Sequence, residues 1–520
     1  MGGTVIASIP SAVLLGVDGR SVSVEVHVSN GLPGLTMVGL PDAAVRESRD
    51  RVRAALVSSG LAWPRRRVTV NLAPSGMKKA GSGLDLPIAM GILVASGVVA
   101  PEAVAGHAFV GELGLDGSLR GVPGTMVLAG ALLSHRLVVA DANMREARLA
   151  GGDCISAPTL AELVARCTGR HPWSDAPTAD PTSPDAAAGG RAPGCDDVVQ
   201  ADLRDVLGQP IARRALEVAA TGGHHLLMVG PPGAGKTLLA TRLAGLLPDL
   251  DPDTSRVVTR IHSAAGGSTT VDRLVTRPPF RAPHHGVSSV ALVGGGSVAM
   301  RPGEIGLAHG GTLFLDELGE FPTTILDALR QPLEEGVVRV SRARGSITYP
   351  ARFLLVAAMN PCPCGEGGVP GSCRCSPGAR SRYARRLSGP LLDRFDIAIR
   401  IERPAARDLV SPTPGEGTAP VAARVMAARR RAEERGVRVN AELPGPGLDE
   451  SAPLDDEAKE LLERHLCSGR LSARGLHRVR RLARTVADLD GAGATVAVHH
   501  LTEALFLRGS RSLVLGEEIR

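Results

Sequence analysis

The residues best suited to chemistry lie in a glycine-rich loop that follows the short apolar run Leu226–Val229. The loop consists of Gly230, Pro231, Pro232, Gly233, Ala234, Gly235, Lys236 and Thr237. It matches the pattern G-x-x-x-x-G-K-[ST], and we expect a helix to start near Leu238. In this arrangement backbone N–H groups close around phosphate oxygens, and the start of the helix adds partial positive charge. We expect Lys236 to reach the β- and γ-phosphates of ATP and Thr237 to ligate Mg²⁺. The alternative is a chance glycine-rich turn.

Two acidic residues, Asp316 and Glu317, end a second apolar run at Thr312–Leu315. An acid at the end of a strand beside the loop can hold Mg²⁺ through water, and its neighbour can polarise the attacking water. A solvated turn is the usual alternative for such a pair, but the apolar strand before it favours the catalytic interpretation. A third apolar run, Phe353–Ala358, leads to Asn360, which we expect to contact the γ-phosphate or the attacking water.

Two arginines further along the chain could add positive charge to such a site. Arg394 follows the segment Gly389–Leu392 and could stabilise transition-state charge on the nucleotide of a neighbouring subunit. A surface salt bridge is the alternative. Arg474 could act from a helical lid, although it could also be one of many arginines on a basic helix. An arginine that acts on a neighbour implies a ring of subunits.

Four cysteines form two C-x-C pairs, which are Cys362, Cys364, Cys373 and Cys375. Four thiolates this close in sequence can surround one tetrahedral Zn²⁺, and the glycines between the pairs let the chain wrap. Unligated or redox-active thiols are the alternative, because C-x-C is less diagnostic than C-x-x-C. His284 and His285 are a second candidate metal pair, but such a pair is more often a loop or contact element.

The composition predicts a cytoplasmic protein with no membrane partner. Its 520 residues suffice for about three domains of roughly 150 residues each. No basic segment precedes the first apolar stretch, so we expect no cleavable signal peptide. The most apolar run, Leu86–Ala100, is too short and too broken to span a bilayer. In a reducing compartment the cysteines are then thiols or metal ligands rather than disulfides.

Four parts can be distinguished along the chain. Residues 1–170 predict a mixed α/β domain, and residues 171–197, rich in Pro, Ala, Asp and Gly, predict a flexible linker. Residues 198–402 hold the nucleotide motifs, and residues 403–520 begin Pro-rich and then predict helices. The strands expected from patterning in the first part are Ser21–Val28, Arg67–Leu72 and His135–Ala140. The expected helices include Asp42–Ser59, Pro420–Arg435 and Asp455–His465.

Several longer segments resemble the YifB/ComM family of magnesium-chelatase-like AAA+ ATPases over nearly the full length. They read LPGLTMVGLPDAAVRESRDRVRAAL, GSGLDLPIAMGIL, VGELGLDGSLRGVPG and RPPFRAPHHGVSSVALVGGGSVAMRPGEIGLAHGGTLFLDEL, with NPCPCG followed by CRC. The resemblance implies a Lon-protease-like (S5-like) α/β domain, a P-loop AAA+ module of the magnesium-chelatase type with a β-hairpin at 336–349, and a C-terminal helical lid. It also implies that Asn360, Arg394 and Arg474 are sensor 1, the arginine finger and sensor 2.

The resemblance implies an ATP-hydrolysing, hexameric DNA helicase or translocase that promotes branch migration during DNA uptake or recombination. Its partner would be single-stranded or branched DNA. One alternative is a motor subunit for metal insertion into a tetrapyrrole, although a Lon-like domain and a C-x-C loop are not expected there. The other alternative is a non-catalytic platform in which ATP sets the oligomeric state.

A net charge of +6 fits a polyanionic partner without demanding one. The candidate DNA contacts, each of which could instead be a solvated face, are Arg339, Arg342, Arg344, Arg380, Arg382, Arg385, Arg386 and the run 429–431.

A Lon-like domain raises the question of peptidase activity, which needs a Ser–Lys pair. Ser82 lies in a Gly-Ser-Gly loop, but no lysine occurs from Gly111 to Ala150, where the partner is expected. We therefore predict an inactive domain, with Lys78 or Lys79 as the remaining alternative base.

Overall fold

The protein is described by a computed structural model that covers residues 6–509 with gaps at 78, 80, 174–201, 267–270, 297–299, 343–344, 367–372 and 412–413. Most of the predicted linker, residues 171–197, lies outside the described residues. No helix in the described ranges is long and apolar enough to cross a membrane.

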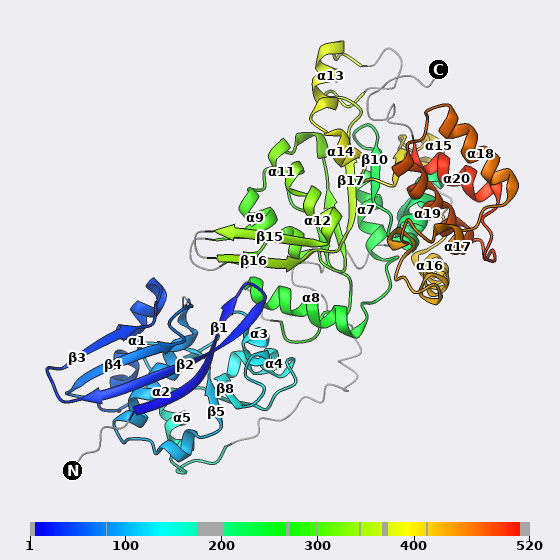
Figure 1. The fold of residues 1–520 in the computed structure, drawn as a ribbon. Helices are drawn as coiled ribbons and strands as arrows, with labels where there is room; N and C mark the ends of the chain where they lie inside the picture. Colours follow the sequence, from blue (N-terminus) through cyan, green and yellow to red (C-terminus); the bar gives the residue numbers. More distant parts are fainter. Residues whose placement is uncertain are drawn as a thin grey trace.

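The N-terminal part has three sheets and mixed α/β content (Figure 1). A four-stranded sheet in the order β1-β2-β4-β3 contains β1 (Ile6–Leu15), β2 (Asp18–Ser29), β3 (Gly34–Val38) and β4 (Arg67–Ala73). A three-stranded parallel sheet contains β5 (His107–Phe109), β8 (Arg136–Ala140) and β9 (Cys154–Ala157), while β6 (Glu112–Leu113) pairs with β7 (Leu119–Arg120). The helices are α1 (Ala43–Ser58), α2 (Asp85–Ala95), α3 (Thr125–Gly130), α4 (Met144–Arg148) and α5 (Leu160–Cys167).

The long strand β2 has a sequence in which apolar and polar residues alternate. Val22, Val24, Val26 and Val28 are buried, and the residues between them are more exposed, as expected for a strand with one face on the core. Helix α2 is buried along nearly its whole length and packs on β1 and β2. The Asp42 carboxylate accepts a hydrogen bond from the Val45 amide, which confirms Asp42 as the N-cap of α1.

The central part is built on a five-stranded parallel sheet in the order β11-β14-β17-β10-β18. Its strands are β10 (Leu226–Val229), β11 (Phe280–Arg281), β14 (Thr312–Leu315), β17 (Leu354–Met359) and β18 (Ile397–Arg400). The larger helices around it are α6 (Pro210–Gly222), α7 (Lys236–Ala244) and α8 (Pro252–Ala265). Every residue of β10, β14 and β17 is buried. Both faces of these strands are therefore covered, which explains why their sequences are continuously apolar. Because the strands are parallel, the loops after them meet at one edge of the sheet.

Shorter elements connect these strands. They are α9 (Ser289–Val293), β12 (Gly294–Gly295), β13 (Arg301–Pro302), α10 (Glu304–Leu307), α11 (Thr323–Ala328), α12 (Arg330–Glu335), α13 (Pro377–Arg385) and α14 (Gly389–Leu392). The hairpin expected at 336–349 is present as β15 (Val337–Arg342) and β16 (Gly345–Pro350). One of its faces is apolar, with Val338 and Val340 opposite Tyr349 and Ile347.

That apolar face meets the N-terminal part at the turn between β1 and β2 (Figure 1). A Cβ placed on Gly16 would lie 2.4 Å from the Ile347 side chain, so glycine is needed for this close approach. A second contact links α4 to α8, where the Ser263 hydroxyl donates to the buried Glu146 carboxylate at 2.6 Å. Burial raises the pKa of Glu146. The hairpin and α8 therefore tie the two α/β parts together.

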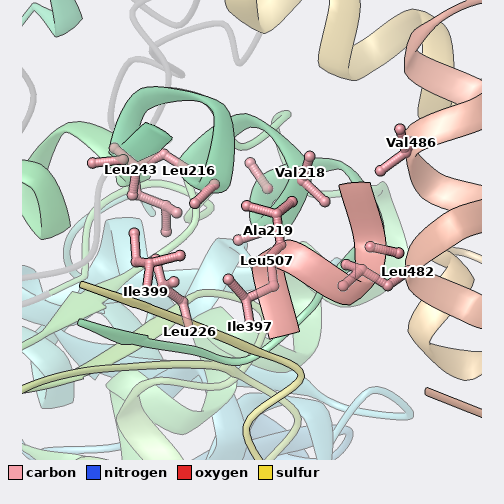
Figure 2. Close-up of a cluster of buried hydrophobic side chains, with 14 of the residues drawn as sticks. Leu216, Val218, Ala219, Leu226, Leu243, Ile397, Ile399, Leu482, Val486 and Leu507 are labelled. Atoms are coloured by element: carbon pink, nitrogen blue, oxygen red, sulfur yellow. The ribbon is translucent and has the colours of Figure 1, made fainter. Parts of the chain in front are cut away.

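The C-terminal part is helical, as expected. Its elements are α15 (Ala406–Val410), α16 (Thr418–Glu434), α17 (Leu448–Ser451), α18 (Asp456–Cys467), α19 (Ala473–Leu489) and α20 (Val498–Arg508). Figure 2 shows the core that joins these helices to the sheet, with Leu482 and Val486 of α19 and Leu507 of α20 in the same cluster as Ile397 and Ile399 of β18. This apolar contact fixes the helices beside strand β18.

Two details differ from the sequence expectations. The helix after the glycine-rich loop begins at Lys236, two residues earlier than expected, because the loop is complete at Gly235. The arginine run 429–431 is only partly available to DNA. Arg429 donates to the Ala220 carbonyl, and Arg431 donates to the Asp488 carbonyl, so two of the three guanidinium groups serve helix packing.

The buried Asp488 carboxylate gives a test of this helical core. It accepts hydrogen bonds from Arg484 at 2.8 Å and Asn440 at 2.7 Å, it also pairs with Arg435, and its side chain is 0% exposed. Asp488→Ala leaves two guanidinium groups without their buried partner and should lower the free energy of unfolding by about 3–5 kcal/mol. Denaturant titration followed by circular dichroism measures this. Glu463→Ala, at an exposed position on α18, is the matched control, and an equal loss in both variants would contradict the prediction.

Candidate nucleotide site

The glycine-rich loop spans the gap between β10 and α7 and borders a pocket of about 390 Å³. Gly233 and Gly235 have φ angles of 75° and 86°, in the left-handed region that favours glycine. A Cβ on either residue would meet no atom within 4 Å, so the space over the loop is open. Gly230 is required for a different reason: a Cβ there would lie 2.2 Å from the Ile401 carbonyl oxygen. The loop is thus an open cradle, which we call the phosphate cradle after the ligand that its sequence predicts.

The Lys236 ammonium lies in the middle of this cradle. It donates to the carbonyl oxygens of Gly230 at 2.7 Å and Pro231 at 3.0 Å, and to Asn360 Oδ1 at 3.0 Å. Asn360 reaches it because β10 and β17 are adjacent parallel strands in which Val229 pairs with Met359. Burial lowers the pKa of Lys236, and the nearby Asp316 and Glu317 carboxylates oppose that effect.

The acidic pair borders the same pocket from the next strand, β14. The Thr237 hydroxyl donates to Asp316 Oδ2 at 2.5 Å, and the Asp316 Oδ1 accepts from the Glu317 amide at 2.9 Å. Glu317 has a φ angle of 53°, a left-handed conformation that costs a non-glycine residue about 1–3 kcal/mol. Backbone strain of this kind at Glu317 is typical of a residue whose position matters for function. The Thr237 hydroxyl and the Asp316 carboxylate are the kind of oxygen ligand that Mg²⁺ prefers.

His285 was not predicted to belong to this site. Its Nδ1 lies 3.1 Å from Glu317 Oε2, and the His284 ring lies against it with centroids 3.9 Å apart. Both imidazoles border a second pocket of about 320 Å³ that shares Thr237, Asp316 and Glu317 with the first. Glu317 therefore lies between the phosphate cradle and the histidines. The order of strands, with β11 beside β14, brings His285 here, and that order is not readable from the motif.

Neither of the two predicted arginines borders the pocket of its own chain. Arg394 pairs with Glu334 on α12, and Arg474 lies in the first turn of α19. Burial lowers the pKa of Arg394, and the positive charges of Arg478, Arg474 and Arg330 lower it further. These arginines therefore lie near one another, and Arg394 and Arg474 are not among the residues that border the phosphate cradle.

The four C-x-C cysteines lie together, with all four Sγ atoms within 4.8 Å of one another. Cys362 is buried, and Cys364 is exposed. His284 and His285 do not belong to such a cluster among the described residues, so the second candidate metal pair is better explained as a contact element.

A second group that could hold a metal by distance alone contains Asp490, His499 and His500. Two of its three members already have protein partners. His500 Nδ1 accepts from the Ala497 amide at 3.0 Å, which leaves the proton on Nε2, and Asp490 accepts from Arg214 at 3.1 Å. This group is therefore explained by the capping of α20 and by an ion pair.

The contact with Glu317 predicts a kinetic role for His285. His285→Ala should lower kcat for nucleotide hydrolysis several-fold and leave KM nearly constant. The reason is that the imidazole contacts the Glu317 carboxylate but does not border the phosphate cradle. His285→Asn keeps a donor near the position of Nδ1 and should restore most of the wild-type rate. His284→Ala is the control, and steady-state kinetics with varied ATP is the measurement. A change in KM alone would contradict the prediction.

Three family models match successive parts of the chain. The model described as magnesium chelatase, subunit ChlI, matches residues 202–409. A model of subunit ChlI of Mg-chelatase matches residues 24–143, and a model of the ChlI C-terminal region matches residues 415–508.

Curated relatives match over nearly the whole length. The protein YifB of Escherichia coli is 44% identical over 506 residues, which are 96% of this chain and 96% of the relative. Competence protein ComM of Haemophilus influenzae is 41% identical over 517 residues, which are 98% of each chain. The magnesium-chelatase 38 kDa subunit of Rhodobacter capsulatus is 30% identical over 312 residues, covering 56% of this chain and 83% of the subunit. The chain therefore belongs to the YifB/ComM family of magnesium-chelatase-like AAA+ proteins, a family that implies an ATPase.

Proposed function

We propose that the protein is a ring-forming motor that hydrolyses ATP to move single-stranded or branched DNA during DNA uptake or recombination. One observation carries the ATPase: Lys236 donates to Asn360 at 3.0 Å while Thr237 donates to Asp316 at 2.5 Å, around one open phosphate cradle. Three strands thus contribute the three kinds of group that hydrolysis of a phosphoanhydride needs. The DNA partner is supported by the name of ComM, a competence protein, and by the exposed arginines described below.

The chemistry follows from these residues. The amides of the loop and the Lys236 ammonium would bind the β- and γ-phosphates, and Thr237 and Asp316 would hold Mg²⁺. Bound Mg²⁺ would neutralise the charge that develops on the phosphate oxygens. The Glu317 carboxylate accepts a proton from water as the water oxygen bonds to the γ-phosphorus and the bond to the β-phosphate oxygen breaks. Asn360 orients that water or the γ-phosphate. The zinc expected from the cysteines would be structural and take no part in this step.

The arginines support a ring. Arg394 and Arg474 are not among the residues that border their own phosphate cradle, and we infer that they act on the ATP of a neighbouring subunit. A neighbour would also give Arg394 a phosphate partner in exchange for Glu334, its ion-pair partner within the chain. We assign Arg394 the role of arginine finger and Arg474 that of sensor 2, in a hexamer.

Helix α13 is the best candidate for a DNA contact. Arg380, Arg382 and Arg385 are exposed on it, whereas Tyr383 and Ala384 turn inward. Arg386 is partly engaged, since it donates to the Gly319 carbonyl at 2.8 Å. On the hairpin, Arg339 is exposed but pairs with Glu335; Arg344 and the Arg342 side chain lie outside the described residues.

The remaining parts complete the proposal. Residues 1–170 form a Lon-like domain without peptidase activity, residues 171–197 a linker, residues 198–402 the AAA+ module and residues 403–520 the lid, in a cytoplasmic protein. The absence of lysine from Gly111 to Ala150 supports the loss of peptidase activity, and the amine of Lys79, the alternative base, donates to the Pro74 carbonyl. Lys78 lies outside the described residues.

A motor for tetrapyrrole metal insertion is the second candidate, because the Rhodobacter capsulatus subunit is a relative. The experiment that separates the two is the ATPase rate of the purified protein with single-stranded, duplex and junction DNA. Stimulation by junction or single-stranded DNA supports the DNA motor. Equal ATPase rates without DNA and with each of the three DNA forms would contradict the DNA motor.

Two site variants test the ATPase itself. Lys236→Ala should abolish nucleotide binding, because it removes the only side-chain ammonium among the residues that border the pocket. Glu317→Gln should retain ATP binding and lower kcat by at least about 100-fold, since the amide cannot accept the proton of the attacking water. Filter binding with labelled ATP and a phosphate-release assay measure the two effects. Full function of Glu317→Gln in cells that require the protein would favour the assembly platform instead.

The DNA contact of α13 has its own test. Changing Arg380, Arg382 and Arg385 together to Ala should weaken single-stranded DNA binding and lower the slope of log K against log salt by about 2, at about 0.7 for each lost phosphate contact. The matched control changes the exposed Arg407, Arg464 and Arg470. Fluorescence anisotropy across a salt series measures the slope, and equal slopes in both triple variants would rule out α13.

A further inference from the structure

The sulfur atoms of the C-x-C cysteines have the spacing of a metal site. Cys362 Sγ lies 3.3 Å from Cys364 Sγ and 3.7 Å from Cys373 Sγ, and the last two sulfurs are 3.7 Å apart. A tetrahedral Zn²⁺ with Zn–S bonds of about 2.3 Å has S···S edges of about 3.8 Å. A disulfide bond of about 2.05 Å is far shorter than any of these distances. We propose that Cys362, Cys364, Cys373 and Cys375 bind one structural Zn²⁺ that clamps the phosphate loop to helix α13.

The ligand set decides which metal ion fits. All four sulfur atoms lie within 4.8 Å of one another, and among the described residues no carboxylate or imidazole belongs to this cluster. A tetrahedral set of four thiolates selects zinc or iron, and neither magnesium nor calcium. The site therefore takes a soft metal ion that is distinct from the Mg²⁺ of the nucleotide pocket.

One side of the cluster packs on the phosphate loop. Cys362 follows Asn360 by two residues. A Cβ on Gly365 would lie 2.6 Å from Pro232 Cδ, so these two loops touch closely. Arg403 bridges the same loops, because it donates to the Pro232 carbonyl at 3.4 Å and to the Glu366 carboxylate at 2.6 Å.

The other side of the cluster starts helix α13. Cys375 is followed by Ser376, whose hydroxyl accepts from the Ala379 amide and caps the helix. On the inner face of α13, Tyr383 packs against Gly319, two residues after Glu317; a Cβ on Gly319 would lie 2.4 Å from the Tyr383 oxygen. A metal ion that joins Cys362 and Cys364 to Cys373 and Cys375 would thus hold α13 at a set distance from Asn360 and the phosphate loop.

Metal content tests the zinc site directly. The full-length protein, purified without chelator, should contain about one zinc per chain by plasma mass spectrometry. Cys364→Ser with Cys373→Ser should reduce zinc to near zero, and Cys467→Ser, at an exposed cysteine on α18, should retain it. Co²⁺ exchanged into the wild type should show the absorption bands of a tetrahedral thiolate site. Zinc retained by the double variant, iron in place of zinc, or a wild type that takes up neither zinc nor Co²⁺ would overturn the proposal.

The clamp rests on the proposed nucleotide site, and its test is separate. Removal of zinc from the wild type by a chelator should weaken binding of a fluorescent ATP analogue at least several-fold, and added Zn²⁺ should restore it. Far-UV circular dichroism before and after shows whether the chain stays folded, so that a general loss of structure is distinguished from loss of the clamp. Lys236→Ala should lose the analogue but keep its zinc. Unchanged analogue affinity in the folded, zinc-free protein would overturn the clamp while the zinc site stands.

Discussion

The hydrogen bond from Lys236 to Asn360 is the contact on which the rest of the site depends. It joins the loop after β10 to the end of β17, and it holds only because these strands are parallel neighbours in one register. Strand β14, on the other side of β17, then places Asp316 where the Thr237 hydroxyl reaches it. A shift of one residue in either pairing would move the acids or the amide to the other face of the sheet. The apolar core of the sheet thus sets the geometry of a polar site.

Lys236 and Glu317 have hydrogen-bond or ion-pair partners within the chain when no nucleotide is bound. Lys236 has three acceptors within 3.0 Å, so a buried ammonium with a lowered pKa does not lack partners. Phosphate oxygens bound in the pocket would have to replace one or more of these protein acceptors. Glu317 is held in a similar way by His285, although on the side away from the cradle. Ordering of the site before the nucleotide arrives reduces the entropy lost on binding.

Several contacts connect this pocket to distant parts of the chain. The cysteine cluster and Arg403 join the phosphate loop to α13, and the hairpin β15–β16 joins the central sheet to the N-terminal part. Helix α19 packs its apolar face on α6 and carries Arg474 at its start. Two of these connections use a glycine for close approach, Gly365 against Pro232 and Gly16 against Ile347. Because these contacts are close, a movement of the phosphate loop should also shift the loop that leads to α13.

The sequence by itself predicted that the glycine-rich loop, the acids after β14 and Asn360 lie together, that the four cysteines meet, and that the C-terminal part is helical, because local chemistry and short-range patterns specify each of these features. The period-two run in β2 and the cap at Asp42 likewise predicted real elements, with ends shifted by a few residues. Only the tertiary structure decided that His285 contacts Glu317, that Arg429 donates to the Ala220 carbonyl, and that Arg394 pairs with Glu334. Those facts depend on strand order and on helix docking, which arise from long-range burial of apolar surface and leave no mark in a short motif.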